Sequence, residues 1–235
     1  AVICSGTPST CTPADSGSVG IFSSMDNVTV VDGTIHRFGT GVALGTNGKV
    51  RGIRALSNAG TGILIDGAGG TVQNSVVDGN AGNGIVLTEA GGWIAANVAK
   101  KNEAGIEAVG GTVISQNTAF ENSTHGIATG YLSTAINNSA NDNGTYGILA
   151  GRGTVVTGNA AGRNDIGIFV GDGSLAQGNT LYENISVGMT TGEEPAYLGN
   201  VIQGSSRAMM RENGKGATRI GRGACNGSKL CNYRK

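Results

Sequence analysis

A repeat of 20 to 22 residues runs through most of the chain and restricts its fold more than any other feature. In residues 135–150, Asn138 is followed five residues later by Asn143, and then by the pair Gly147-Ile148. The Gly-Ile pair or a close variant recurs nine times, at positions 41, 62, 84, 105, 126, 147, 167, 188 and 208. A fixed period of this length, with glycines at turns and β-branched residues between them, is typical of a solenoid in which each copy forms one coil.

Each coil divides into three short extended pieces separated by turns. In the piece that begins with Gly-Ile, alternation along the strand places one set of side chains on a single face, which we expect to be the core. This set contains Ile63, Ile85, Ile106, Ile127, Ile148 and Ile168. The sequence therefore predicts an all-β, single-domain parallel β-helix of about nine coils, with an N-terminal cap at 1–26, coils at 27–211 and a C-terminal cap or tail at 212–235.

Charge and hydropathy exclude two classes of partner. Sixteen basic and sixteen acidic residues cancel, so no overall field favours nucleic acid or an anionic membrane. No run of 18 apolar residues is present, so we expect no membrane span. Glycine makes up 43 of 235 residues, but its regular offsets indicate turns and not a disordered chain.

The four cysteines flank the repeat. Cys4 and Cys11 precede it, and Cys225 and Cys231 follow it. A rigid rod keeps its ends apart, so we predict that the cysteines pair within each end and that disulfides tie both caps. A zinc site is the alternative, but it would want closer spacing or a nearby histidine. Disulfides imply an oxidising compartment, which favours a secreted or periplasmic location.

An asparagine at the head of each copy predicts a ladder of stacked amides. Such amides can donate to one neighbouring coil and accept from the other, which satisfies a polar group that would be costly to bury alone. The predicted ladder consists of Asn74, Asn97, Asn117, Asn138, Asn159, Asn179 and Asn200.

The repeats resemble those of the right-handed parallel β-helix proteins of the pectate-lyase-like superfamily, over about residues 27–211. The resemblance implies a secreted protein that binds or acts on polysaccharides. Relatives that process uronic-acid polymers use acidic residues beside an Arg, Lys or His base, often with calcium, so calcium is implied by the resemblance alone. The Gly-His-Gly and Asp-Pro-His signatures of such relatives are missing here. No catalytic residue can be carried over, and the repeat is specific for the fold and weak for function.

A column of charged residues four positions after the ladder offers the best candidates for chemistry. It contains Arg37, Asp78, Lys101, Glu121, Asp142, Arg163 and Glu183. His125 and Tyr146 share another offset and should stack on consecutive coils. The predicted candidate site combines Lys101, Glu121, His125, Asp142 and Tyr146, because carboxylates beside a cationic or imidazole base can transfer protons. The alternative is a solvated row of ion pairs and an aromatic cover over a turn.

The residue after each Gly-Ile pair should point outward, and in this column apolar side chains predominate. They include Leu64, Val86, Ala128, Leu149, Phe169 and Met210, interrupted by Glu107 and Thr190. An apolar stripe of this length usually marks a covered or associating surface. We therefore hold two hypotheses open: a polysaccharide-binding or polysaccharide-processing protein, and a non-catalytic structural or adhesion rod that self-associates through the stripe.

Overall fold

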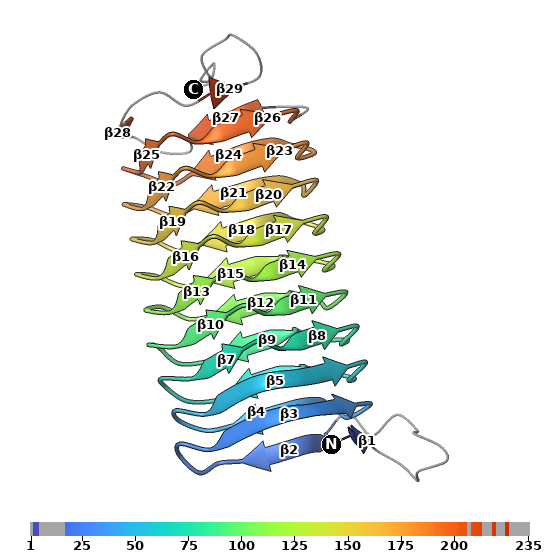
Figure 1. The fold of residues 1–235 in the computed structure, drawn as a ribbon. Coiled ribbons are helices and arrows are strands. Elements are labelled where there is room, and N and C mark those ends of the chain that lie inside the picture. Colours follow the sequence, from blue (N-terminus) through green and yellow to red (C-terminus); the bar gives the residue numbers. More distant parts are fainter. Residues whose placement is uncertain (1, 5–16, 206–207, 213–217, 220–223, 226–235) are drawn as a thin grey trace.

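The computed structural model describes residues 2–4, 17–205, 208–212, 218–219 and 224–225. Figure 1 shows one elongated stack of coils, with β2 at one end and β26 and β27 near the other. Every strand pairing is parallel, and the described residues contain no helix. An all-β parallel solenoid of about nine coils is therefore confirmed.

One strand of each coil belongs to a ten-stranded sheet. Its strands are β2 (Val19–Ser23), β4 (Thr40–Leu44), β6 (Ile63–Ile65), β9 (Ile85–Leu87), β12 (Ile106–Ala108), β15 (Ile127–Thr129), β18 (Tyr146–Ala150), β21 (Ile166–Val170), β24 (Val187–Thr191) and β27 (Ala208–Glu212). Because β2 already pairs with β4, the regular stacking begins within residues 1–26. The division into caps and coils otherwise stays a prediction.

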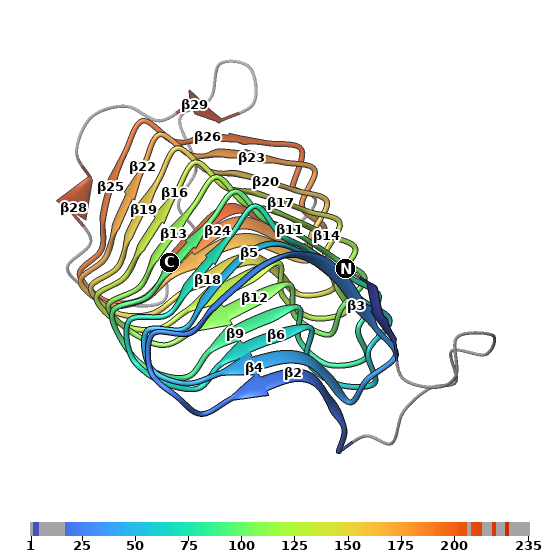
Figure 2. The same cartoon turned by 60° about the horizontal axis from the view of Figure 1, so that its bottom comes forward.

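The remaining strands form a bent nineteen-stranded sheet, visible as two faces in Figure 2. At the N-terminal end, β3 (Thr29–His36) and β5 (Lys49–Leu56) are longer strands that run through both rows, because β5 pairs with both β7 and β8. The short strand β1 (Val2–Cys4) pairs with the second half of β3. The first row continues through β7 (Thr71–Gln73), β10 (Trp93–Ala95), β13 (Val113–Ser115), β16 (Thr134–Ile136), β19 (Val155–Thr157), β22 (Leu175–Gln177), β25 (Ala196–Leu198) and β28 (Thr218–Arg219). The second row contains β8 (Val76–Asp78), β11 (Val98–Lys100), β14 (Thr118–Phe120), β17 (Ser139–Asn141), β20 (Ala160–Gly162), β23 (Thr180–Tyr182), β26 (Val201–Gln203) and β29 (Ala224–Cys225).

The predicted isoleucine column forms one wall of the core. All six of its members are 0% exposed. The second row contributes mainly alanines to the interior, among them Ala99, Ala119 and Ala140. These small side chains let the glycine before each core isoleucine approach closely, so a Cβ built on Gly126 would lie 3.1 Å from the Cβ of Ala140.

The glycine column is required by the spacing between coils. A Cβ on Gly126 would meet the carbonyl oxygen of Gly147 at 2.7 Å, and a Cβ on Gly147 would meet that of Gly167 at 2.6 Å. Backbone atoms of a parallel stack cannot move apart without breaking the ladder of hydrogen bonds. The recurrence of glycine at this offset therefore reflects a steric limit and not a need for flexibility.

The predicted asparagine ladder is present, and it is fully hydrogen-bonded. Asn138 is representative: its Nδ2 donates to the carbonyl of Ile114 at 2.9 Å and to Oδ1 of Asn159 at 3.0 Å. Its own Oδ1 accepts from the backbone N–H and Nδ2 of Asn117, at 2.9 and 3.0 Å. One predicted member is wrong, because Asn74 is exposed with a φ of 49°, and Ser75 takes the buried ladder position instead.

A second ladder, which the sequence analysis did not predict, runs five residues after the first. Its amides make the same bonds from coil to coil, and all are buried. Its members are Asn58, Asn80, Asn102, Asn122, Asn143, Asn164 and Asn184. The five-residue spacing within each copy was the signal for it. The two ladders hold both ends of the second-row strands β11, β14, β17, β20 and β23 in register.

The predicted pairing of the cysteines lies outside the described residues, because residues 5–16 and 226–235 are not described. The described residues contain no helix that is long and apolar enough to cross a membrane.

Candidate functional site

The predicted site residues fall into two groups. Lys101, Glu121 and Asp142 lie at the corner between the second row and the second ladder, where each residue has a φ between 56° and 57°. His125 and Tyr146 lie at the edge of the ten-stranded sheet. Among the described residues, no hydrogen bond or ion pair joins the two groups. The contacts of these residues are therefore made within the two groups, Lys101 with Glu121 and His125 with Tyr146, and their joint role stays a prediction.

The corner group consists of ion pairs between neighbouring coils. Lys101 Nζ lies 3.7 Å from Glu121 Oε2, and Arg163 contacts Asp142 through two hydrogen bonds of 2.7 and 2.6 Å. Asp142 thereby raises the pKa of Arg163 above its usual range. All four side chains are substantially exposed, so solvent screens these pairs. Their alternating signs oppose misregister of the coils and leave no free base.

One predicted member of the charged column belongs elsewhere. Asp78 is in register with Lys100 and forms an ion pair with it at 3.2 Å, whereas Gly79 takes the corner position beside Lys101. The outer face of the second row carries two cation–π contacts, Lys100 on Phe120 and Arg163 on Tyr182, with distances to the ring centroid of 5.8 and 5.4 Å. These contacts satisfy the charges locally.

The His125 and Tyr146 rings stack on consecutive coils, as their shared offset predicted. Their centroids are 5.4 Å apart, and Tyr146 makes an edge contact with Phe169 at 6.1 Å. Phe169 belongs to the apolar column on the outer face of the ten-stranded sheet. His125 and Tyr146, which each lie two positions before a core isoleucine, are therefore on this outer face, next to the glycine column.

Glu107 completes this cluster, and sequence reasoning missed it. In the sequence Glu107 only interrupts the apolar column. In the structure it lies one coil before His125, and its carboxylate acts to raise the pKa of that side chain. Asn83 Nδ2 donates to Glu107 Oε2 at 2.5 Å, which holds the carboxylate over the sheet. The two residues occupy different offsets of the repeat, because His125 lies two positions before Ile127 and Glu107 lies one position after Ile106 of the preceding coil. A comparison of equal offsets in the sequence therefore does not pair them.

Burial determines the charge state of His125. Desolvation lowers the pKa of His125 below its usual value of 6.5, and the carboxylate of Glu107 opposes this shift by favouring the imidazolium. The imidazole Nδ1 is buried and has no hydrogen-bond partner within the described structure. At neutral pH the ring is therefore neutral, and a neutral imidazole can accept a proton.

The apolar column beside this cluster is half-buried over most of its length. Leu64, Val86, Leu149 and Phe169 are all partly covered, and only Phe22 at the N-terminal end is largely exposed, at 69%. Met210 does not belong to the column, because its backbone is in register with Met189 of the core set, and Arg211 is the residue in register with Thr190 of the column. Self-association through this stripe stays a prediction.

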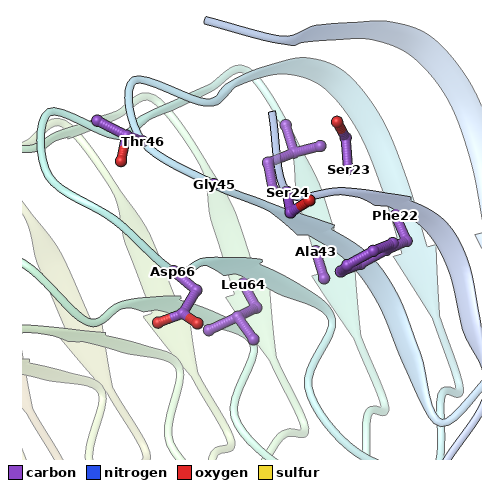
Figure 3. A pocket seen from close by; sticks show the side chains of 9 residues that line it. Phe22, Ser23, Ser24, Ala43, Gly45, Thr46, Leu64 and Asp66 are labelled. Carbon is purple, nitrogen blue, oxygen red and sulfur yellow. The ribbon is translucent and has the colours of Figure 1, made fainter. Parts of the chain in front are cut away.

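A hollow of about 250 Å³ opens at the N-terminal end of the same face. Figure 3 shows that Phe22, Ala43 and Leu64, from three successive strands, line it, with the carboxylate of Asp66 beside Leu64. Asp66 accepts a hydrogen bond of 2.7 Å from the Thr88 hydroxyl and is the only ionisable residue in the lining. The hollow offers an apolar contact surface without an acid–base pair.

Metal binding finds no support in the described side chains. Nowhere in residues 17–205 do three or more His, Cys, Asp or Glu residues come together in a way that could hold an ion. Calcium also takes backbone and amide oxygens, so it stays an implication of the sequence resemblance alone. The acid–base cluster of Glu107, His125 and Tyr146 is the chemistry that this part of the chain offers.

The chain belongs to the family described as right handed beta helix region, whose model matches residues 4–119 and 49–185. Its parallel solenoid is accordingly right-handed, which is the usual sense of a parallel crossover. No curated protein sequence is similar enough to count as a relative.

Several solved structures share the fold at low identity. The A-module of mannuronan C-5 epimerase AlgE6 from Azotobacter vinelandii is 14% identical, with a TM-score of 0.69 over 88% of this chain and 76% of that one. The AlgE4 A-module of the same organism is 18% identical, with a TM-score of 0.65 over 81% and 65%. The catalytic unit of an α-1,3-glucanase from Streptomyces thermodiastaticus is 13% identical, with a TM-score of 0.63 over 90% and 51%. The chain thus spans about half to three quarters of these proteins, and the likeness is one of fold.

Proposed function

We propose that this protein acts on an extracellular or periplasmic polysaccharide, which it binds on the outer face of the ten-stranded sheet. One observation carries the proposal: a neutral imidazole lies between a carboxylate and a tyrosine on that face. A structural histidine at this depth would normally satisfy both ring nitrogens. The Nδ1 of His125 is unsatisfied but buried, so a bound hydroxyl or carbon acid would transfer its proton to the other ring nitrogen, Nε2.

Each member of the cluster has a distinct role. His125 accepts the proton, and Glu107 stabilises the imidazolium that forms. Tyr146 lies against the His125 ring, where its phenol can donate a proton to the same bound sugar. The half-buried side chains of Ala128 and Leu149 form an apolar floor that suits the faces of sugar rings.

The solved structures that share the fold support this reading at the level of class. Two are modules of mannuronan C-5 epimerases and one is an α-1,3-glucanase, and a further one is a periplasmic alginate epimerase with a TM-score of 0.62. Proteins of this shape thus include several whose names specify polysaccharides. At 11–18% identity they indicate neither the sugar nor the reaction for this chain.

Variants in the two groups of candidate residues test the proposal. We expect His125→Gln and Glu107→Gln to lose turnover on polygalacturonate, alginate or α-1,3-glucan, while Lys101→Ala and Asp142→Asn in the corner group retain it. Turnover is followed by new reducing ends, by absorbance of unsaturated products and by NMR of the sugar configuration. Binding is followed by calorimetry on the same polymers.

The outcomes separate the hypotheses. Turnover that depends on His125 establishes an enzyme. Binding that depends on Tyr146 without turnover indicates a polysaccharide-binding rod. The absence of both binding and turnover on all three polymers would refute the proposal and favour the structural rod.

A further inference from the structure

A leucine in a left-handed conformation interrupts a column of glycines at the other edge of the ten-stranded sheet. Leu132 has a φ of 52°, and the equivalent residues of the coils on either side are Gly111 and Gly153, with φ of 68° and 65°. Three further coils have glycine here, at positions 69, 91 and 173, and the coils at the two ends of the column have Asn47 and Glu194, with φ of 53° and 48°. This conformation costs a residue with a Cβ about 1–2 kcal/mol. The leucine is moreover 69% exposed, so burial does not offset that cost.

Leu132 and its neighbour Tyr131 lie flat across the adjacent coils. A Cβ on Gly110, in the preceding coil, would lie 2.9 Å from the Tyr131 ring. A Cβ on Gly153, in the following coil, would lie 2.8 Å from a methyl carbon of Leu132. The two side chains thus extend in opposite directions over glycines and form a platform that spans three coils. Tyr131 is 57% exposed, so the platform faces solvent.

Arg152 adds a positive charge to this platform. Its carbonyl accepts the backbone N–H of Leu132 at 3.0 Å, which places Arg152 one coil beyond Tyr131. The side chain is exposed and forms no ion pair with any other described residue. Tyr131, Leu132 and Arg152 together line a hollow of about 360 Å³. Arg163, at the corner beside the second row, is by contrast held by the carboxylate of Asp142.

The platform is aligned with the acid–base cluster. Tyr131 follows His125 by six residues in one coil, and Arg152 follows Tyr146 by six residues in the next. The strands β15 and β18 lie between them, side by side. Six extended residues span at most about 20 Å, so one chain of a few sugar units could contact both edges of the sheet.

We propose that Tyr131, Leu132 and Arg152 form a binding subsite for an acidic sugar unit of the same polysaccharide. The inference rests on the proposed function and names the charge of the ligand. The phenol ring and the leucine offer a flat apolar surface to a sugar ring, and the unpaired guanidinium matches a carboxylate with two parallel donors. The left-handed conformation belongs to the turn, since every residue of this column has a positive φ. A ligand contact explains why a leucine is kept where glycine would be unstrained.

Binding and stability measured on the same variants test this subsite. The probes are oligomers of polygalacturonate or alginate, and the same oligomers with their carboxylates methyl-esterified. Loss of a charge-assisted pair or of a stacked ring should weaken binding about tenfold, so we expect this effect for Arg152→Gln and Tyr131→Ala. Esterification should weaken wild-type binding by a similar factor and should not affect Arg152→Gln. Arg51→Gln, which removes the same charge from an exposed site on β5, is the matched control and should bind as the wild type.

Leu132→Gly separates a ligand contact from a structural role. Because glycine adopts a positive φ without strain, this variant should unfold at an equal or higher denaturant concentration and yet bind the acidic oligomer more weakly. A variant that loses stability and keeps its affinity would overturn the assignment of Leu132.

The remaining outcomes distinguish this inference from the proposed function. If the wild type binds the acidic oligomers and the Tyr131 and Arg152 variants bind equally well, the subsite is wrong and the proposed function stands. If the wild type binds only α-1,3-glucan, the acidic assignment is wrong. If no polymer binds, and the variants instead change the mass of the protein by light scattering, the platform is a contact between copies of this chain and both proposals fail.

Discussion

Replacing Asn138 with alanine should destabilise the fold by an amount that can be estimated from its four hydrogen bonds. The backbone N–H of Asn117 would lose its acceptor, Oδ1 of Asn138. Asn117 Nδ2 would keep two other acceptors, and Asn159 Oδ1 would still accept the backbone N–H of residue 138. One fully unsatisfied buried donor costs about 1–3 kcal/mol. We therefore expect a loss of about 2–4 kcal/mol in total, once the weakened acceptors are included.

Serine is an informative comparison, because this chain already uses it in the ladder. The hydroxyl oxygen of Ser75 accepts the backbone N–H of Ile53 at 3.2 Å. In Asn138→Ser the hydroxyl oxygen should likewise accept the backbone N–H of Asn117. The loss of stability should therefore be about half of that caused by alanine. The adjacent Asn137 is exposed with a φ of 54°, so Asn137→Gly should be close to neutral.

Urea unfolding followed by circular dichroism, with hydrogen exchange at the Asn117 amide, measures these effects. Hydrogen exchange is included because a solenoid can unfold in segments, in which case a single midpoint is not defined. An alanine variant as stable as the wild type, or a serine variant less stable than the alanine variant, would refute the reasoning from hydrogen-bond satisfaction.

Three further predictions concern the glycine column, His125 and the apolar column. Gly147→Ala should lower the urea midpoint more than Gly173→Ala, since a Cβ at Gly147 meets a backbone carbonyl at 2.6 Å whereas none of the described atoms lies within 4 Å at Gly173; equal midpoints would contradict this. Because the pKa of His125 is lowered on folding, its protonation favours the unfolded state, so the wild type should lose stability relative to His125→Gln as pH falls below 6.5 and show no such difference above it. Leu149→Asp should leave the mass by light scattering unchanged if the half-buried stripe contacts sugar, and should reduce it if the stripe joins copies of the chain.

The period of the repeat was enough to predict the coil, the core isoleucines and the first ladder. Errors arose where coils differ in length by a residue. Asn74 was assigned to the ladder because it is an asparagine, although the five-residue spacing from Asn80 points to Ser75. The same one-residue slip misplaced Asp78 and Met210. In a strand such a slip moves a side chain to the opposite face, so composition alone cannot detect it.

The candidate site was only half predictable for a related reason. His125 and Tyr146 share an offset, and a column is visible in the sequence. The contact between Glu107 and His125 crosses from one column to another between coils, so it depends on the three-dimensional register. Leu132 could have been noticed as a leucine among glycines, but the strain that makes it informative is a backbone angle, which the sequence does not state.

The two ladders also have a direction. In every pair of asparagines the amide nitrogen of one coil donates to the amide oxygen of the coil that follows it in the chain, from Asn58 to Asn184 and from Asn97 to Asn200. The aligned dipoles in such a row polarise one another. Within each ladder, every coil offers its amide oxygens to the preceding coil and its amide N–H groups to the amide oxygens of the following coil. A duplicated segment of about one period that keeps both asparagines would fit between any two coils without a new interface. The rod can therefore change length during evolution in whole coils, by tandem duplication or deletion, while the chemistry on its faces diverges independently.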